Sequence, residues 1–223
     1  MKPGRFIVFD GCDAAGKTTQ LRLLHAALTA KGISAILTRE PGGTPFGEKL
    51  REAFLEDIDN ISIVAQIYTM MAIRAQHIEK KIIPTLAAGT WVLCDRFIDS
   101  SRVYQGYFPG YDPVTKQQDM RFVDLIDKCY REIVTFHPGY SKSQYFIFDL
   151  PTHVALERLS VRTEKANAID VRPRAFHDYV GSCYRDRIYK DYPRRILIDA
   201  QPDIDSVHAT LLSHIFPNVE VQS

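Results

Sequence analysis

The chain has 223 residues, of which 45% are hydrophobic and 25% are charged, proportions typical of a globular protein. Its 28 Lys and Arg residues nearly balance its 27 Asp and Glu residues, which argues against a non-specific nucleic-acid binder because such proteins usually carry a strong basic excess. The length favours a single domain over residues 1–223 with a substantial core.

Short apolar runs alternate with longer amphipathic segments along the chain. The runs are too short for helices and predict five strands buried on both faces: Phe6–Phe9, Ala35–Leu37, Trp91–Cys94, Tyr145–Phe148 and Ile196–Ile198. Helical spacing predicts helices over Lys17–Ala30, Ile63–Leu86, Phe122–Ile133 and Val154–Leu159. This alternation indicates an α/β fold, a five-stranded parallel sheet with helices on both faces.

Two segments do not fit this alternation. Gly106–Asp119 contains two Gly, two Pro and two Tyr residues, which predicts a loop. Thr163–Pro173 is polar and has no apolar period. We expect it to form a short mobile lid, within approximately residues 161–174.

The cysteines and the apolar runs bear on location. Four cysteines lie far apart and form no CxxC pair, which disfavours a disulfide framework or a zinc site. No stretch approaches the roughly 20 apolar residues of a membrane span, and the apolar run near the N-terminus is too short for a signal peptide. We expect a cytoplasmic protein with no membrane partner.

The segment Gly11–Thr18 reads Gly-Cys-Asp-Ala-Ala-Gly-Lys-Thr and fits the pattern GxxxxGK[ST]. It follows the first predicted strand and opens a helix, a context in which backbone N–H groups bind phosphates. In such a loop Lys17 reaches the β- and γ-phosphates and the Thr18 hydroxyl binds Mg²⁺. The sequence therefore predicts a P-loop that binds a nucleotide through Gly11, Cys12, Asp13, Ala14, Ala15, Gly16, Lys17, Thr18 and Thr19.

An acidic residue at the end of a second buried strand usually supports the metal beside a P-loop. Asp95 follows the predicted strand Trp91–Cys94, so Thr18 and Asp95 are the predicted Mg²⁺ ligands. Asp149 ends another strand but is a weaker candidate, because it could simply cap the helix that follows Pro151.

Three further segments predict where a phosphate acceptor binds. Thr38–Thr44, with the sequence TREPGGT, follows the second strand; Asp95–Gly106 follows the third; and Arg74–His77 lies on the long predicted helix. Ligands of open α/β sheets bind at the carboxyl ends of the strands. Together these segments predict a second anion pocket opposite the P-loop.

With these motifs the sequence resembles the thymidylate kinase family of P-loop nucleoside-monophosphate kinases. The resemblance covers nearly the whole chain and is carried by TREPGGT, by RAQH and by DRF, SS and YQG within Asp95–Gly106. It implies transfer of the ATP γ-phosphoryl group to dTMP for dTTP synthesis, with ATP and Mg²⁺ as cofactors. It also implies a homodimer packed through long helices; the apolar face of Ile63–Ile83 is a candidate surface, or it simply covers the sheet. From the balanced charge we expect no nucleic-acid partner.

The resemblance implies roles for individual residues. Arg39 and Arg96 would hold the acceptor phosphate, and Asp13 would approach the sugar 3′-hydroxyl. Glu40 would join the metal and water network with Asp95. The implied catalytic residues are Lys17, Arg96, Asp13 and Arg162.

The base and the sugar would occupy the remainder of the acceptor pocket. Arg74 and Gln105 would bond opposite edges of thymine, Tyr104 would pack on the deoxyribose, and Ser100 or Ser101 would support the base and Arg96. The implied acceptor-binding residues are Asp13, Arg39, Glu40, Met70, Arg74, Arg96, Ser100, Ser101, Tyr104 and Gln105.

Four positions depart from the family pattern. Asp10 replaces the usual Glu at the end of the first strand, and Met70 stands where the family stacks a Phe on thymine. The stretch His137–Gln144 lacks the usual Pro-Asp ending. The lid lacks the usual arginine, for which Arg162, Lys165, Arg172 or Arg174 could substitute.

Two other functions remain open from the residues. A deoxynucleoside kinase would need a carboxylate base, for which Glu40 could serve, but it would leave the arginine pair Arg39 and Arg96 without a purpose. A P-loop switch that hydrolyses nucleotide slowly would explain Met70 and the altered lid.

Phosphate transfer to dTMP requires no strong base, because the acceptor phosphate is already ionised. Positioning and charge neutralisation would carry the catalysis.

Overall fold

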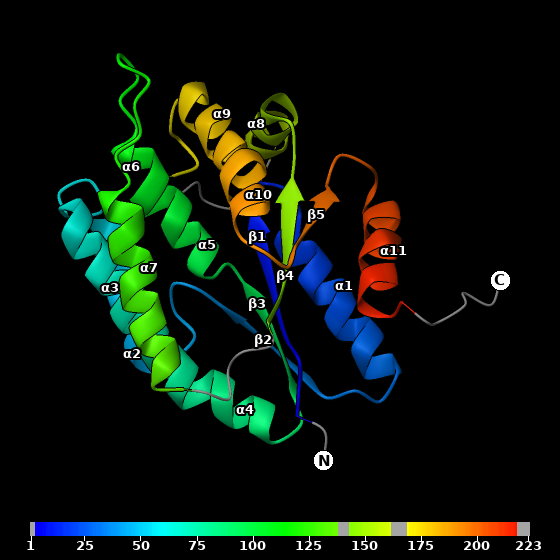
Figure 1. Ribbon diagram of the computed structural model, residues 1–223. Helices are drawn as coiled ribbons and strands as arrows, with labels where there is room; N and C mark the ends of the chain where they lie inside the picture. Colours follow the sequence, from blue (N-terminus) through cyan, green and yellow to red (C-terminus); the bar gives the residue numbers. More distant parts are fainter. Residues whose placement is uncertain (1–2, 138–142, 162–168, 218–223) are drawn as a thin grey trace.

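The computed structural model of the chain describes residues 3–137, 143–161 and 169–217. Within these residues five parallel strands form one sheet in the order β2-β3-β1-β4-β5, with helices on both faces (Figure 1). The α/β prediction is confirmed, and all five predicted strands are present. Their bounds are β1 Phe6–Gly11, β2 Ala35–Arg39, β3 Trp91–Asp95, β4 Ser143–Asp149 and β5 Arg195–Asp199.

The helical elements alternate with these strands. They are α1 Lys17–Ala30, α2 Pro45–Glu56, α3 Ile63–His77, α4 Ile83–Ala87, α5 Ile98–Ser101, α6 Phe108–Gly110, α7 Arg121–Thr135, α8 Thr152–Ser160, α9 Arg174–Cys183, α10 Tyr189–Asp191 and α11 Ile204–Ile215. In the described part of the chain, π-helical turns join some of them, η1 Ile78–Ile82, η2 Arg102–Tyr107 and η4 Tyr184–Ile188. The helix predicted over Ile63–Leu86 is thus α3, η1 and α4 in succession.

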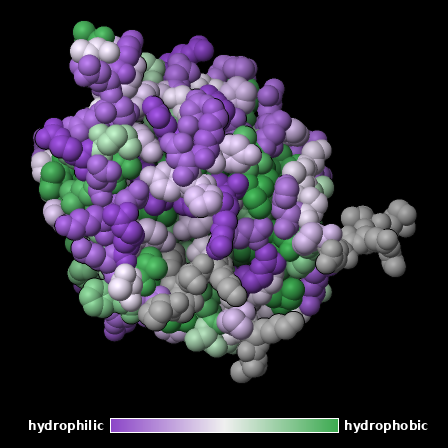
Figure 2. Space-filling model, viewed as in Figure 1, coloured by the Kyte–Doolittle hydropathy of each residue, from purple (hydrophilic) through white to green (hydrophobic). Residues whose placement is uncertain are grey.

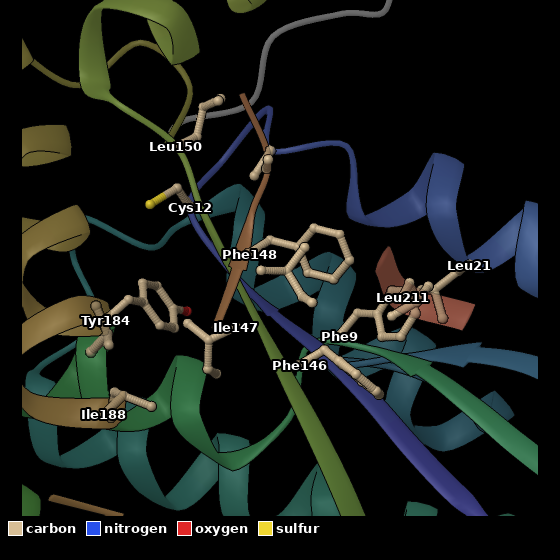
Figure 3. Close-up of a cluster of buried hydrophobic side chains, with 14 of the residues drawn as sticks. Phe9, Cys12, Leu21, Phe146, Ile147, Phe148, Leu150, Tyr184, Ile188 and Leu211 are labelled. Carbon is tan, nitrogen blue, oxygen red and sulfur yellow. The ribbon is translucent and has the colours of Figure 1, made fainter. Parts of the chain in front are cut away.

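The central strand β1 is buried along its whole length, because its apolar residues face helices on both sides of the sheet. On one side Phe9, with Phe146 and Phe148 of β4, packs against Leu21 of α1 and Leu211 of α11 (Figure 3). On the other side α3 and α7 cover the sheet (Figure 1). Burial on both faces explains why the strands have apolar runs without alternation.

The sheet register aligns the strand ends that matter for function. Phe9 pairs with Asp95 of β3, and Gly11 pairs with Phe148 of β4. The connection from β1 leads to β2 at one edge of the sheet, whereas the connection from β3 crosses to β4 on the other side of β1. The switch point therefore lies between β1 and β3, where open α/β sheets bind ligands.

The loop prediction for Gly106–Asp119 is wrong at its start. Gly106 and Tyr107 belong to η2, and Phe108–Gly110 forms α6. A Cβ atom at Gly106 would lie 2.9 Å from Cγ2 of Val123, so glycine here allows η2 to pack closely on α7. Only the following residues are irregular, with an isolated bridge between Tyr111 and Gln118.

The surface of the face shown in Figure 1 is mostly hydrophilic, with scattered hydrophobic residues (Figure 2). No helix in the described ranges is long and apolar enough to cross a membrane.

A buried ion network anchors α5 and η2 to the rest of the fold. Asp99, fully buried, pairs with Arg102 at 2.6 Å and with Arg195 of β5 at 2.9 Å. Arg102 also pairs with Asp127 of α7 at 2.7 Å and lies over the ring of Tyr192. The network fixes the segment that follows β3 against both β5 and α7.

We expect Asp99→Asn to lower the free energy of unfolding by about 3–5 kcal/mol, because it leaves two largely buried arginines short of negative charge. Urea unfolding of the purified variant measures this loss. Asp186→Asn is the matched control, since Asp186 pairs with Lys190 on the surface, and it should cost less than about 1 kcal/mol. Equal losses in the two variants would contradict a stabilising role for the buried network.

Candidate functional site

The loop between β1 and α1 has the backbone of a phosphate-binding loop. Gly11, Ala14 and Gly16 have φ angles of 128°, 57° and 79°. At Gly11 a Cβ atom would lie 2.2 Å from the carbonyl oxygen of Phe148, so a side chain is excluded there. Gly16 precedes α1, whose N-terminus has no side-chain cap. The first N–H groups of α1 are thus left for an anion.

Lys17 lies over this loop. Its Nζ donates hydrogen bonds to the carbonyl oxygens of Gly11, at 3.2 Å, and Cys12. Burial, followed by repulsion from Arg96, lowers the pKa of Lys17. Cys12 and Ala15 of the loop are buried, whereas Thr18 and Thr19 are exposed at the start of α1.

The two predicted metal ligands lie together. The Thr18 hydroxyl donates a 2.6 Å hydrogen bond to Oδ2 of Asp95 at the end of β3. A hydroxyl and a carboxylate are oxygen ligands that suit Mg²⁺, which usually takes its remaining ligands from water and phosphate. Accordingly, the described residues include no cluster of three or more His, Cys, Asp or Glu side chains suited to a metal.

Arg96 joins the phosphate loop to the opposite side of the crevice. It follows β3 with a φ angle of 64°, and its guanidinium pairs with Asp13 at 2.5 Å. It also donates to Ser100 Oγ at 3.0 Å and lies over the ring of Tyr104. The Tyr104 hydroxyl donates to the second oxygen of Asp13 at 2.9 Å. Four predicted site residues therefore form one cluster.

Charge stabilises Asp13 in this cluster. Burial by itself would raise the pKa of the Asp13 carboxyl, but Arg96 and then Lys17 lower it, and the net shift is downward. Asp13 is consequently held as the anion between two cations.

Asp10 fixes the segment that carries Arg96. It is fully buried and accepts hydrogen bonds from the backbone N–H groups of Phe97 and Ser100 and from the hydroxyls of Ser100 and Tyr184. Burial raises the pKa of Asp10. A shorter carboxylate at the end of β1 therefore still ties β1 to α5.

Tyr184 belongs to this site although the sequence analysis did not single it out. It lies on η4, and its buried hydroxyl contacts Asp10 at 2.7 Å and Ser100 Oγ at 3.1 Å. Nothing near Tyr184 in the sequence resembles a motif, so only the fold reveals it.

Arg74, Glu40 and His77 form a second buried cluster. Arg74 Nε donates to Glu40 Oε2 at 2.8 Å, and His77 Nδ1 lies 3.0 Å from Glu40 Oε1. Arg74 Nη2 also donates to Ser101 Oγ at 3.0 Å. The carboxylate of Glu40 thus turns toward Arg74 instead of joining Asp95 as expected, because a buried guanidinium requires a counter-charge. The contact between Glu40 and Asp95 is a backbone one: the Glu40 N–H donates to the carbonyl oxygen of Asp95 at 2.9 Å.

The positions implied for the base are buried. Met70 lies in the core with Met71 and Phe97, and Gln105 is buried on η2. Arg74 lies over the ring of Phe97, with 5.0 Å between its guanidinium carbon and the ring centroid.

Arg39, a predicted residue, lies near Arg51, which the sequence analysis missed. The Arg39 side chain is exposed and pairs with Glu48 of α2 at 2.8 Å. Arg51, also on α2, donates to the Pro41 carbonyl oxygen at 2.9 Å. Burial lowers the pKa of Arg51, and repulsion from Arg39 and Arg96 adds to that shift. Arg51 therefore lies in the positive field of both Arg39 and Arg96, a cluster of charge that favours an anionic ligand. The signal in the sequence was the basic residue one helical turn after Glu48.

The remaining predicted residues are the lid cations and Asp149, and those that the structure describes have acidic or basic partners. Arg162 and Lys165, with most of the expected lid, lie outside the described residues. Arg172 pairs with Asp59 in the connection between α2 and α3, and Arg174 pairs with Asp178 at 3.6 Å. Asp149 pairs with Arg185 of η4 at 2.7 Å, which accounts for it without a metal.

The chain is similar to known proteins over nearly its whole length. A family model described as Thymidylate kinase matches residues 9–211. The thymidylate kinase of Gluconobacter oxydans (strain 621H) is 36% identical over 220 residues, which cover 98% of this chain and 97% of the relative. The thymidylate kinase of Dichelobacter nodosus (strain VCS1703A) is 33% identical over 212 residues, which cover 95% of this chain and 97% of the relative.

A solved structure also matches. The crystal structure of thymidylate kinase from Ehrlichia chaffeensis superposes with a TM-score of 0.70 at 29% identity, and the match covers 96% of this chain and 99% of that chain. This likeness confirms the predicted P-loop NTPase type of fold.

The charge on Asp13 predicts a pH-dependent stability. Because its folded pKa lies below the unfolded value of about 3.9, ionised Asp13 stabilises the fold above that pH and loses this effect as the pH falls through the folded pKa. We expect Asp13→Asn to be less stable than the wild type by about 1.5–3 kcal/mol at pH 6. The difference should shrink toward pH 3. Urea unfolding of both proteins between pH 6 and pH 3 tests this, and a constant difference would contradict it.

Proposed function

The chain belongs to the thymidylate kinase family of nucleoside-monophosphate kinases, which use ATP as the phosphate donor, and we propose that it phosphorylates dTMP at the cluster around Arg96. The observation that carries this site assignment is the position of Arg96, which contacts Gly11 and Asp13 of the P-loop on one side and Ser100 and Tyr104 on the other. A group held by Arg96 therefore lies next to the phosphates of a nucleotide bound to the P-loop.

The acceptor phosphate binds Arg39, Arg51 and Arg96 in this proposal. Two of these side chains have partners that a phosphate replaces, since Arg39 pairs with Glu48 and Arg96 with Asp13. Charge-assisted hydrogen bonds to phosphate are strong enough to compete with such pairs. Tyr104, beside Asp13, packs on the deoxyribose.

Catalysis follows from positioning and charge. The acceptor phosphate is ionised at neutral pH, so the chain has no proton to remove before transfer. Lys17 and Arg96 neutralise the charge that develops on the transferring group, and the crevice holds donor and acceptor in line. Water competes as an acceptor, so its exclusion is part of the reaction.

Thr18 and Asp95 hold Mg²⁺ in this proposal, since their oxygen atoms lie 2.6 Å apart beside the P-loop. When bound, the metal supplies positive charge to the donor phosphates.

The thymine base binds near Arg74 and Gln105. Glu40 and Ser101 hold Nε and Nη2 of Arg74, whereas Nη1 points to the sulfur of Met71 at 3.6 Å. A thioether is a weak acceptor, so Nη1 remains able to donate to a carbonyl oxygen of the base.

The geometry disfavours a deoxynucleoside kinase. Such an enzyme needs a carboxylate base near the attacking hydroxyl. Both oxygens of Glu40, the candidate base, are taken by Arg74 and His77. The three arginines would also lack an anion to bind.

Acceptor-dependent ADP release tests the proposal. We expect ATP and Mg²⁺ to give rapid ADP release with dTMP, and little with UMP, thymidine or no acceptor; dUMP serves as the probe of the base pocket. Lys17→Ala should lower kcat at least about 100-fold, the usual cost of losing one transition-state charge. Its affinity for dTMP, measured by calorimetry, should change little.

Arg96→Ala is the comparison variant and should weaken both turnover and dTMP binding, because it removes a contact to the acceptor as well. ADP release that does not depend on the acceptor would indicate a nucleotide-hydrolysing switch and would refute the kinase assignment.

We also propose a homodimer formed through α3. Ile67 and Met71 of α3, with Ile78 of η1, are buried against the sheet, so the inner side of the predicted face covers the core. Val64 and Tyr68 lie one helical turn apart on the outer side, with 45% and 54% of their surface exposed. A neighbouring pair of exposed apolar side chains suits an interface between subunits.

We expect the wild type to have twice the 25.4-kDa mass of the chain in light scattering, and Tyr68→Glu to be monomeric, since a buried carboxylate would be unpaired in the interface. Val114→Glu is the control, because Val114 is also exposed but lies far along the chain from α3. A monomeric wild type would overturn the dimer.

We propose a reducing, cytoplasmic location as well. Cys12, Cys94, Cys129 and Cys183 are all free thiols, as is usual in the cytosol.

A further inference from the structure

His177 is a buried side chain that the proposed reaction does not use. It lies in the first turn of α9, with 7% of its surface exposed, and its ring meets that of Phe176 edge to face. Among the described residues, its buried Nε2 has no hydrogen-bond partner. Buried polar atoms are rarely left without a partner, so this nitrogen calls for an explanation.

A small cavity lies beside His177. Its volume is about 10 Å³, and it is lined by Cys12, Asp13, Leu150, Thr152, Ala155, His177 and Val180. Figure 3 shows Cys12 beside Leu150 at the ends of β1 and β4. The cavity is thus bounded by residues of α9 on one side and by Cys12 and Asp13 of the P-loop on another.

The size and lining of the cavity suit one water molecule. A cavity of about 10–15 Å³ is the least that holds a water, which needs two to four polar partners. The cavity is too small for a phosphate. Three of the lining residues, His177, Asp13 and Thr152, carry polar groups, and a water can donate to one such group while accepting from another.

Asp13 has capacity for this further contact. One of its oxygens accepts from Arg96 and the other from the Tyr104 hydroxyl, whereas a carboxylate offers about four acceptor positions. In the proposed reaction Arg96 turns toward the acceptor phosphate, which weakens its hold on Asp13. A third contact would then keep Asp13 oriented toward the acceptor sugar.

Cys12, the thiol that lines the cavity, is not a nucleophile. Burial raises the pKa of its thiol, so Cys12 is a neutral thiol and a poor nucleophile.

We propose that His177 is a positioning residue that holds Asp13 through a water molecule in this cavity. The inference rests on the proposed acceptor site, because its effect on the reaction requires Asp13 to face the acceptor. His177 itself touches neither substrate.

Steady-state kinetics of two substitutions test the proposal. His177→Phe fills a similar volume without a polar atom and should raise the KM for dTMP about five- to tenfold, the effect of one lost hydrogen bond, with the KM for ATP within about twofold of the wild type. His177→Gln keeps a polar group at this position and should restore the KM for dTMP to within about twofold. Tyr179→Phe is the control on α9, since the Tyr179 hydroxyl bonds Gln118 and not the P-loop, and its kinetics should be unchanged.

A merely structural His177 gives a different pattern. In that case His177→Phe would raise the KM for dTMP and for ATP together, or His177→Gln would be as impaired as His177→Phe. Either result would overturn the proposal. Should His177→Phe fail to fold, a high-resolution crystal structure of the wild type decides the matter. Water bridging Nε2 and Asp13 supports the inference, and an empty cavity refutes it.

Failure of the underlying function has its own signature. A wild type without dTMP-dependent ADP release would refute the acceptor site, whereas an active wild type with unchanged His177 variants would refute only the role of His177.

Discussion

The contact between Arg96 and Asp13 is the interaction on which the site depends. It spans the crevice between β1 and β3, because Asp13 lies in the loop after β1 and Arg96 follows β3 with a left-handed backbone. Buried arginine is costly without a counter-charge, and Asp13 and Asp10 supply it. The same pair lowers the pKa of Asp13 and contacts Tyr104, so the P-loop and the segment that follows β3 form one electrostatic unit.

The cluster around Arg96 and the cluster around Arg74 have different proposed roles. Asp10, Asp13 and Arg96 lie beside the P-loop, where we propose that the phosphates bind, whereas Glu40, Arg74 and His77 form the cluster to which we assign the base. Each cluster joins elements distant in sequence, since Tyr184 contacts Asp10 across 174 positions and Arg74 contacts Glu40 across 34. Such pre-formed networks restrict side-chain rotamers before substrate binds, which lowers the entropy lost on binding.

The sequence predicts the sheet and the P-loop because both are encoded locally. Apolar runs identify buried strands, and the glycines of Gly11–Thr18 identify a backbone that only certain residues adopt. Tyr184, Arg51 and His177 escape such reasoning, because their importance comes from contacts that the fold creates between distant segments. Glu40 illustrates a different failure: a motif places the residue at the right strand end, but the choice between Asp95 and Arg74 as its neighbour depends on burial. The lid residues before Ile169 lie outside the described residues, so their roles remain predictions.

The substitution of Met70 for an aromatic residue bears on base selectivity. Thymine and uracil differ by one methyl group, and an apolar pocket distinguishes such a group by only about 1–3 kcal/mol. Polar contacts discriminate more strongly, because a base that lacks the matching acceptor leaves a buried donor unpaired. Arg74 is held rigidly by Glu40 and Ser101 and rests on Phe97. In the proposed acceptor site the choice between pyrimidines and other bases therefore falls to Arg74, and Met70, which lies in the core, would contribute only the smaller preference for the methyl group. Because a flexible thioether adapts its packing more readily than an aromatic ring, that preference is the part of the specificity most open to change.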